Sequence, residues 1–215
     1  MALAATGAEV LAIEFDRALM PALQETTAMI GGVRLLAADA LRLEWTRVLG
    51  SGPWVVCANL PYNVAMPLLS GMLDAAPMVV RFVLMVQREA GERLVASPGD
   101  PGYGPIALRV QNATVARVLR HVPSSVFWPR PRVESVVVGL ERRAAPAVDV
   151  AAERLRRVVD AGFAERRKAM RNAVVRLGLE PARADDLLRG LGIDPRARAE
   201  QLSLEEFARI AEVMP

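Results

Sequence analysis

Residues 53–62 read PWVVCANLPY, an apolar run that stops at an amide, a proline and an aromatic ring. The run from Val55 to Ala58 predicts a strand buried within a sheet. Asn59 ends that strand, and Pro61 restricts the backbone of the turn that brings Tyr62 beside the amide. The same residues also fit a plain turn with a rigid proline and a half-buried tyrosine. The flanking sequence therefore has to show whether these residues form a functional site or only a structural turn.

Apolar runs of the same kind lie on both sides of this stretch, with helical patterns between them. The runs cover residues 10–13, 33–38, 53–58, 79–87 and 135–140. Continuous apolar strands that alternate with helices predict an α/β fold, with a parallel sheet covered by helices on both faces. Residues 106–119 are apolar and amphipathic, and residues from 151 onward read as short helices broken by glycine and proline. We therefore expect an α/β domain over residues 1–143 and a small all-α domain over 144–215.

Three successive strands of the expected sheet end in polar side chains, Glu14, Asp39 and Asn59. In open α/β sheets, ligands bind beyond the carboxyl ends of the strands. Because parallel strands place these ends on one edge, we expect the three side chains to form a site. Glu14 and Asp39 also fit a plainer role, as caps of the helices that follow them.

Positive charge is concentrated in two segments of a chain whose net charge is only +3. Residues 117–143 hold six arginines against two glutamates, and residues 152–176 hold eight basic against three acidic residues. Two basic segments on a near-neutral remainder suggest a polyanionic partner such as a nucleic acid. Charge alone also fits two solvated faces, so this interpretation needs support from a site.

Several classes of protein are disfavoured by the remaining composition. Cys57 is the only cysteine, which excludes a disulfide within the chain and favours a reducing cytoplasm. Its place in an apolar run predicts a buried, inert thiol. No uncharged apolar run approaches the length of a membrane span. The only histidine, His121, has no partners at metal-ligand spacing, so we expect no metal.

The Asn59-Leu60-Pro61-Tyr62 group suits the alkylation of an exocyclic amine on a nucleobase. Such an amine is a poor nucleophile, because its lone pair is delocalised into the ring. The Asn59 amide oxygen and a neighbouring backbone carbonyl would accept its two hydrogens and direct the lone pair at an electrophile. Pro61 would aim that carbonyl, and Tyr62 offers a face on which an extruded base stacks.

The sequence resembles the KsgA-type ribosomal RNA adenine dimethyltransferases, which use S-adenosylmethionine. The resemblance spans nearly the whole chain. It rests on VLAIEFD (10–16), AADAL (37–41), NLPYNV (59–64), LMVQREAGERLVASPGDPGYG (84–104), VPSSVFWPRPRVESVVV (122–138) and FAERRKAMRN (163–172). It implies a Rossmann-like methyltransferase sheet, a helical C-terminal domain that docks ribosomal RNA, and dimethylation of small-subunit adenines during ribosome assembly.

The resemblance also implies a role for individual residues. Glu14 would bind the ribose hydroxyls of S-adenosylmethionine, Asp39 its adenine amine, and Asn59 would face both cofactor and target amine. Tyr62 and Phe127 would stack on the target adenine. Basic residues of the C-terminal segment would help to dock the immature 30S subunit. These are Arg166, Arg167, Lys168 and Arg171.

The chain departs from the family pattern at its start. The family has a strand and a glycine-rich loop that holds the methionine part of the cofactor, and the sequence from Met1 to Gly7 resembles the end of the helix after that loop. We therefore expect a shortened form that lacks one central strand, with weak cofactor binding. Two alternatives stay open: a related large-subunit dimethyltransferase that confers macrolide resistance, and an RNA-binding assembly factor without catalysis.

Overall fold

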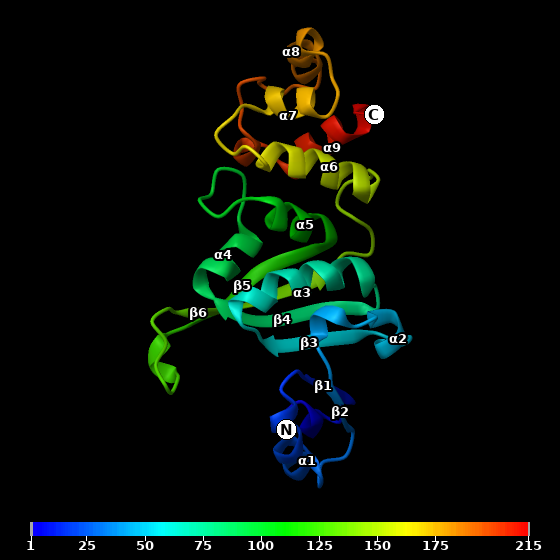
Figure 1. Ribbon diagram of the computed structural model, residues 1–215, viewed down its shortest axis with the longest axis vertical. Helices are drawn as coiled ribbons and strands as arrows, with labels where there is room; N and C mark the ends of the chain where they lie inside the picture. The colour runs from blue at the N-terminus through cyan, green and yellow to red at the C-terminus, as the bar shows by residue number, and fades with distance from the viewer. Residues whose placement is uncertain (1, 215) are drawn as a thin grey trace. The chain divides into compact units, whose positions relative to one another are not determined.

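The computed structural model describes residues 2–214, apart from the side chain of Tyr62 (Figure 1). The chain forms two compact units. The first runs up to Gly52 and includes Pro67–Met78, and the second holds Pro53–Met66 and Val79–Pro215. The predicted boundary between residues 143 and 144 does not coincide with this division, and it stays a prediction about function.

The first unit is built on two parallel strands, β1 (Val10–Glu14) and β2 (Val33–Ala37). Its short helical elements lie before, between and after them. They are η1 (Ala4–Thr6), η2 (Arg17–Leu19), α1 (Met20–Thr27), η3 (Ala40–Arg42) and α2 (Trp45–Leu49). The helix α3 (Tyr62–Ala75) begins in the second unit and ends in the first, and it contains Pro67.

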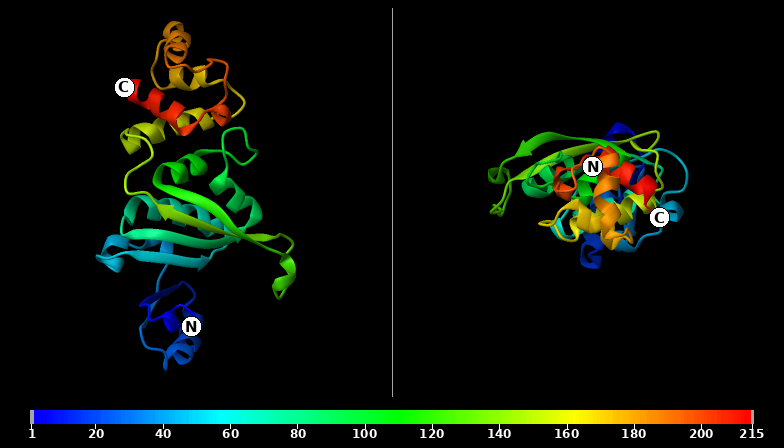
Figure 2. Two further views of the ribbon diagram at one scale, coloured as in Figure 1. Left: turned by 180° about the vertical axis from the view of Figure 1, so that it is seen from behind. Right: turned by 90° about the horizontal axis from the view of Figure 1, so that it is seen from above.

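The second unit contains a four-stranded sheet in the order β3-β4-β6-β5. Its strands are β3 (Trp54–Asn59), β4 (Val79–Gln87), β5 (Thr114–Val122) and β6 (Ser135–Arg142). β3 and β4 are parallel, and the other two pairings are antiparallel. The helices α4 (Arg88–Val95) and α5 (Pro105–Ala113) pack against this sheet (Figures 1 and 2).

The predicted strands are confirmed to within two residues at each end, but the expectation of one parallel sheet was wrong. Two sheets form instead, and the larger one is mixed. The physical reason for the mixed sheet is the connection between β5 and β6. Residues 123–134 contain only the short η4 (Ser124–Val126) and no crossover helix, so the chain turns back and the two strands pair antiparallel. The amphipathic stretch 106–119 is likewise divided, because α5 ends at Ala113 and β5 starts at Thr114.

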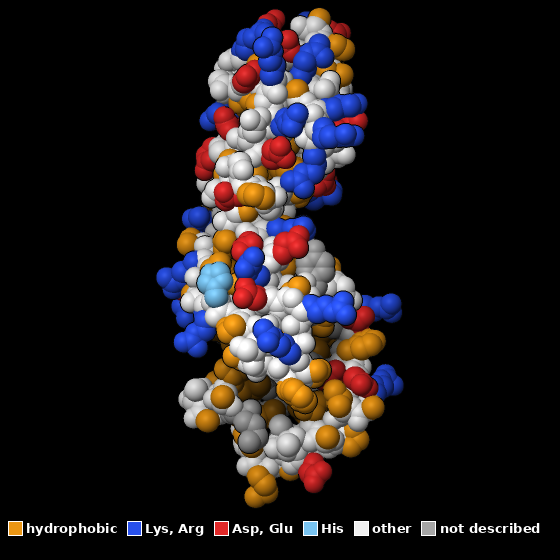
Figure 3. Space-filling model, turned by 90° about the vertical axis from the view of Figure 1, so that its left-hand side faces the viewer, with side chains coloured by type: hydrophobic (Ala, Val, Ile, Leu, Met, Phe, Trp, Pro, Cys, Tyr) orange, Lys and Arg blue, Asp and Glu red, His pale blue; other side chains and the backbone are white. Residues whose placement is uncertain are grey.

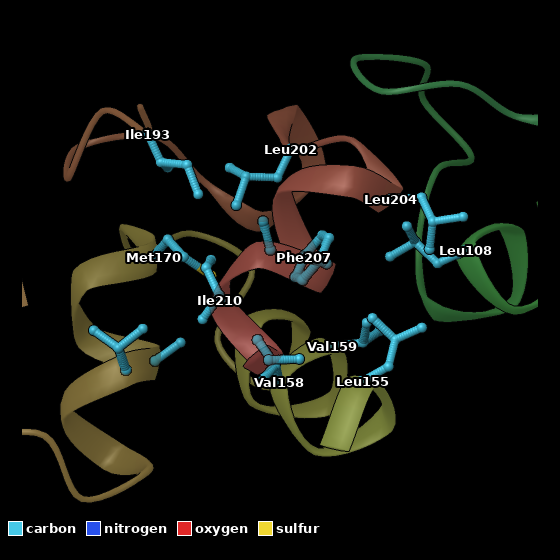
Figure 4. Packing of buried hydrophobic residues seen from close by; sticks show 14 of the residues in the cluster. Leu108, Leu155, Val158, Val159, Met170, Ile193, Leu202, Leu204, Phe207 and Ile210 are labelled. Carbon is cyan, nitrogen blue, oxygen red and sulfur yellow. The ribbon is translucent and has the colours of Figure 1, made fainter. Parts of the chain in front are cut away.

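The helical C-terminal segment shares its core with the helices beside the sheet. It consists of α6 (Ala152–Phe163), α7 (Met170–Arg176), α8 (Pro181–Gly190), η5 (Ala199–Gln201) and α9 (Leu204–Val213). Phe207 and Ile210 of α9 and Leu155 of α6 lie in one cluster with Leu108 of α5 and the buried Tyr103 (Figure 4). Burial of large apolar side chains on this scale stabilises a domain by about 1.5–3 kcal/mol for each residue.

Tyr103 joins the loop between α4 and α5 to the helical segment. Its hydroxyl donates a hydrogen bond of 2.9 Å to the carbonyl of Leu202, and its ring forms a T-shaped pair with that of Phe163, with the ring centroids 6.2 Å apart. Burial raises the pKa of the Tyr103 phenol, with smaller contributions from Glu205 and Glu206. The phenol therefore stays protonated and keeps donating this hydrogen bond at any ordinary pH.

Gly91 is the position where α4 approaches the sheet most closely. A Cβ atom there would lie 2.2 Å from Cγ2 of Val136 and 3.0 Å from Cγ2 of Val138. We expect Gly91→Ala to lower the free energy of unfolding by about 1–3 kcal/mol, because the buried β-branched side chains have no room to move. Urea denaturation followed by circular dichroism measures the change.

The matched control is Gly71→Ala in α3, where an added Cβ would meet nothing within 4 Å. Alanine at that exposed helical position is expected to raise stability by about 0.5–1 kcal/mol. Equal effects of the two substitutions would contradict the close approach at Gly91.

Candidate active site

The end of β3 presents two hydrogen-bond acceptors that the fold leaves unused. Asn59 pairs with Met85 of β4, and its side chain is exposed. The amide of Leu60 donates a hydrogen bond of 3.1 Å to the Met85 carbonyl, which fixes the backbone one residue beyond the strand. Among the described residues, the Asn59 side chain and the Leu60 carbonyl make no hydrogen bond.

The Pro61 carbonyl is not the free acceptor beside Asn59. Its carbonyl accepts hydrogen bonds from the amides of Val64 at 3.0 Å and Ala65 at 2.9 Å. These bonds start α3 immediately after the strand and occupy the Pro61 oxygen. The backbone carbonyl available beside Asn59 is therefore that of Leu60. The predicted role of Tyr62 concerns a side chain outside the described residues, and it stays a prediction.

The loop 123–134 leaves the sheet on the edge where Asn59 lies. Gln87 at the end of β4 pairs with Ser135, and Ser135 pairs with Val122, so both ends of the loop lie at the carboxyl end of β4. Figures 1 and 2 show the loop projecting beyond this end of the sheet. Phe127 lies on it, half-buried, with its amide 3.3 Å from the Ser124 carbonyl.

A contact that sequence reasoning missed holds this loop in place. The Arg88 amide donates a hydrogen bond of 2.9 Å to the Glu134 carbonyl, and Arg88 Nη1 lies 2.8 Å from Glu134 Oε2. Both residues fall within the sequence motifs that resemble the family, and this was the only indication in the sequence that they matter. The double contact ties the base of the loop to the first residue of α4.

Glu14 and Asp39 are brought together at the carboxyl ends of β1 and β2. Glu14 pairs with Ala37, and its carbonyl accepts a hydrogen bond of 2.9 Å from Ala38. Asp39 caps η3 by accepting from the Leu41 amide at 3.0 Å, so the capping role anticipated for it is confirmed. Glu14 Oε1 accepts from the Asp16 amide at 2.8 Å, and Asp16 caps η2.

These carboxylates belong to the first unit, whereas Asn59 and Phe127 belong to the second. Glu14 is half-buried and keeps Oε2 without a hydrogen bond among residues 2–214, so it has an acceptor for hydroxyl donors.

Three of the four predicted docking residues in the helical segment make contacts within the fold. Lys168 Nζ lies 2.8 Å from Glu165, and Arg171 Nε lies 2.7 Å from Asp185. Arg166 donates to the Tyr103 carbonyl at 3.0 Å and lies over the Phe163 ring, 5.9 Å from its centroid. Arg167 is exposed and makes no ion pair in the part of the chain that the structure describes.

The prediction of a buried thiol was wrong. Cys57 is exposed, because β3 buries alternate residues and Cys57 shares its more exposed face with Val55 and Asn59. Within residues 2–214, no group of three or more His, Cys, Asp or Glu side chains could hold a metal ion. No described helix is long and apolar enough to cross a membrane.

Known proteins similar to this chain are ribosomal RNA methyltransferases by name. The family model for ribosomal RNA adenine dimethylase matches residues 2–215. Ribosomal RNA small subunit methyltransferase A of Moorella thermoacetica is 43% identical over 99% of this chain and 77% of its own length. The protein of the same name from Novosphingobium aromaticivorans is 41% identical over 99% of the chain and 77% of its own length.

Two solved structures share the fold. A dimethyladenosine transferase from Plasmodium falciparum superposes with a TM-score of 0.77 at 20% identity, covering 94% of this chain and 80% of that one. The 23S rRNA methyltransferase ErmE superposes with a TM-score of 0.71 at 23% identity, covering 96% of this chain and 82% of that one. At these identities the likeness shows the methyltransferase fold alone.

The Arg88–Glu134 contact predicts local rather than global behaviour. Both side chains are about half exposed, so Glu134→Gln is expected to change the free energy of unfolding by less than about 1 kcal/mol. Amide hydrogen exchange in residues 123–134 should nevertheless become faster, because one of the two ties at the base of the loop is weakened.

Glu141→Gln is the matched control for this substitution. It removes an ion pair of similar exposure, 3.1 Å from Arg81, at the far end of β6. It should leave exchange in the loop unchanged. Unchanged loop exchange in Glu134→Gln as well would show that the ion pair does not position the loop.

Proposed function

Because the chain belongs to the ribosomal RNA adenine dimethylase family, we propose that it dimethylates the N6 amino groups of adenines in small-subunit (16S) ribosomal RNA, with S-adenosylmethionine as methyl donor. One observation supports this most directly. The exposed Asn59 amide and the unbonded Leu60 carbonyl stand together at the end of β3, fixed by the hydrogen bond from Leu60 to Met85. That pair of acceptors matches the two hydrogens of an exocyclic amine.

In the proposed mechanism these two oxygens act on the nucleophile. The Asn59 Oδ1 accepts one N6 hydrogen and the Leu60 carbonyl accepts the other, so that the nitrogen becomes pyramidal and its lone pair is directed outward. Asn59 is a positioning and polarising group rather than a base. When S-adenosylmethionine is bound, it supplies an electrophilic methyl group. Phe127, together with Tyr62, holds the extruded adenine by stacking, which contributes about 1–3 kcal/mol for each base.

Glu14 and Asp39 would hold the nucleoside end of the cofactor. The free Glu14 Oε2 suits the ribose hydroxyls, which are donors that need a carboxylate acceptor. Asp39 would meet the adenine amine, although its Oδ2 also lies 3.4 Å from Arg42 Nε. That exposed ion pair is weak enough to yield to a ligand, since such pairs contribute about 0–1 kcal/mol.

The partner in this proposal is the immature 30S subunit in the cytoplasm. Residues 144–215 form the docking part, with Arg166, Arg167, Lys168 and Arg171 near the RNA. The net positive charge of residues 152–176 supports this assignment. The proposal includes no metal ion.

The alternatives receive less support. The relatives between 39% and 43% identical are small-subunit enzymes by name, whereas the large-subunit enzyme ErmE is only 23% identical. A non-catalytic assembly factor would have no use for the paired acceptors at Asn59 and Leu60. Methyl transfer by the chain itself would distinguish the proposed enzyme from a non-catalytic assembly factor.

Asn59→Ala is expected to lower methyl transfer at least about 100-fold, because one acceptor for the N6 hydrogens is removed. Asn59→Gln should fail almost as severely, since its amide is displaced by one methylene. Transfer of tritiated methyl groups to immature small subunits measures the rate. Affinity for the RNA should stay within about twofold of wild type, and turnover within a few-fold of wild type would refute the assignment.

The salt dependence of RNA binding tests the docking segment. Substituting Arg166, Arg167 and Lys168 by Gln should flatten the plot of log affinity against log salt, because fewer counterions are released. The change should be smaller than for three unpaired cations, since Arg166 and Lys168 already contact Glu200 and Glu165.

A control variant with the same change in charge substitutes three arginines whose side chains lie within 4 Å of carboxylates elsewhere in the helical segment. They are Arg183, Arg189 and Arg209. Its salt slope should match that of wild type. A docking variant that behaves like this control would show that residues 166–168 form a merely solvated face.

A further inference from the structure

Four arginines of the β5–β6 hairpin have no carboxylate partner within the described residues. Residues 117–143 contain two glutamates, and both are already engaged: Glu134 with Arg88 at 2.8 Å and Glu141 with Arg81 at 3.1 Å. Arg142 and Arg143 donate to main-chain carbonyls. The four that remain exposed and free of ion pairs are Arg117, Arg120, Arg130 and Arg132.

A large aromatic side chain lies in the same hairpin, two residues before Arg130. Trp128 is 97% exposed, whereas Trp45 is 7% exposed. Phe127, next to it in the chain, is half-buried. We call Arg117, Arg120, Trp128, Arg130 and Arg132 the hairpin surface.

The hairpin surface is held in a defined shape. Arg130 Nε donates a hydrogen bond of 3.0 Å to Ser124 Oγ across the loop, and three prolines restrict the backbone of residues 123–131. A register shift between Val118 and Arg120 leaves Leu119 as an extra residue in β5. The bulge explains why Leu119, Arg120 and His121 are all exposed in succession.

Two of these arginines lie on one face of the hairpin, because Arg117 pairs with Gly139 and Arg120 with Val137, two residues apart on β6. Figure 3 shows Lys and Arg side chains spread over the surface of the second unit, seen from the side on which the loop projects in Figure 1. The pairing of Gln87 with Ser135 and of Asn59 with Met85 places the base of the loop at the edge of the sheet that holds the candidate active site.

We propose that the hairpin surface binds single-stranded RNA next to the target adenine. Trp128 stacks on a flanking base, and the unpaired arginines contact the phosphates on either side. The inference rests on the proposed function and adds to it the surface that holds the RNA outside the pocket for the extruded base. Free guanidinium groups interleaved with an exposed indole ring are complementary to phosphates and bases, and a stacked base needs no particular sequence.

The comparison with the helical segment favours this surface as a strong RNA contact. Arg166, Lys168 and Arg171 each have a carboxylate within 4 Å, so they exchange one partner for another when they bind a phosphate. The hairpin arginines have no such partner to give up. Each of them should therefore contribute more to RNA affinity than a paired arginine does.

The test measures RNA binding without catalysis. A fluorescein-labelled single-stranded RNA of mixed sequence, about 20 nucleotides long, is titrated with the full chain and followed by anisotropy. Trp128→Ala should weaken binding about fivefold to tenfold, and Trp128→Phe should restore most of the affinity because it keeps a ring. Met29→Ala, at a residue that is also 97% exposed, should bind like wild type.

A second set of variants tests the arginines. Substituting Arg120, Arg130 and Arg132 by Gln should lower the slope of log affinity against log salt by about 0.7 for each phosphate that an arginine no longer neutralises. The variant with Arg183, Arg189 and Arg209 changed to Gln carries the same change in charge and should keep the wild-type slope. Urea denaturation of every variant confirms that it is folded.

The outcomes separate this inference from the proposed function. Wild-type affinity and slope in both hairpin variants would overturn the inference, even if the chain methylates small-subunit RNA. If the hairpin variants bind RNA like wild type but lose binding to a protein, the surface belongs to a protein partner and the inference is again wrong. Weaker RNA binding by the hairpin variants of a chain that transfers no methyl group would support the RNA surface and refute the proposed function.

Discussion

The hydrogen bonding of β4 on both of its edges is the constraint on which the second unit depends. This strand pairs in parallel with β3 and antiparallel with β6, and it buries Phe82, Leu84 and Val86. Its last residues set the position of the candidate site: Met85 holds Asn59 and Leu60, and Gln87 with Arg88 holds the base of the loop that carries Phe127. A shift of one residue in this register would turn every side chain to the other face and separate the two acceptors from the loop.

Apolar continuity in the sequence was enough to locate the strands, as the run from Phe82 to Val86 in β4 illustrates. It was not enough to place the start of α3, which begins at Tyr62 because the Pro61 carbonyl starts the helix, with Pro67 accommodated inside it. The break at Thr114 was hidden for another reason. A short amphipathic helix and the strand after it read as one stretch, because both bury alternate or periodic apolar residues.

The candidate site was predictable to the extent that it lies at strand ends. Glu14, Asp39 and Asn59 were visible as polar residues that end apolar runs, and the structure places the first two together. Ion pairing was not predictable, because it joins residues far apart in the chain, such as Arg88 and Glu134 or Arg171 and Asp185. A count of charges therefore gave residues 117–143 and 152–176 similar weight, although the structure leaves more free cations in the first of them.

The hydrogen bond from Tyr103 to Leu202 has a consequence for how such a chain can change over evolution. The helical segment and the loop between α4 and α5 share one set of buried side chains, so neither presents a finished surface to the other. Exchanging residues 144–215 for those of a distant relative would leave Tyr103 and Leu108 facing a mismatched core. Residues 144–215 would therefore have to be exchanged together with residues 96–108. The start of α6 is not a point at which this fold can be divided without disturbing its core.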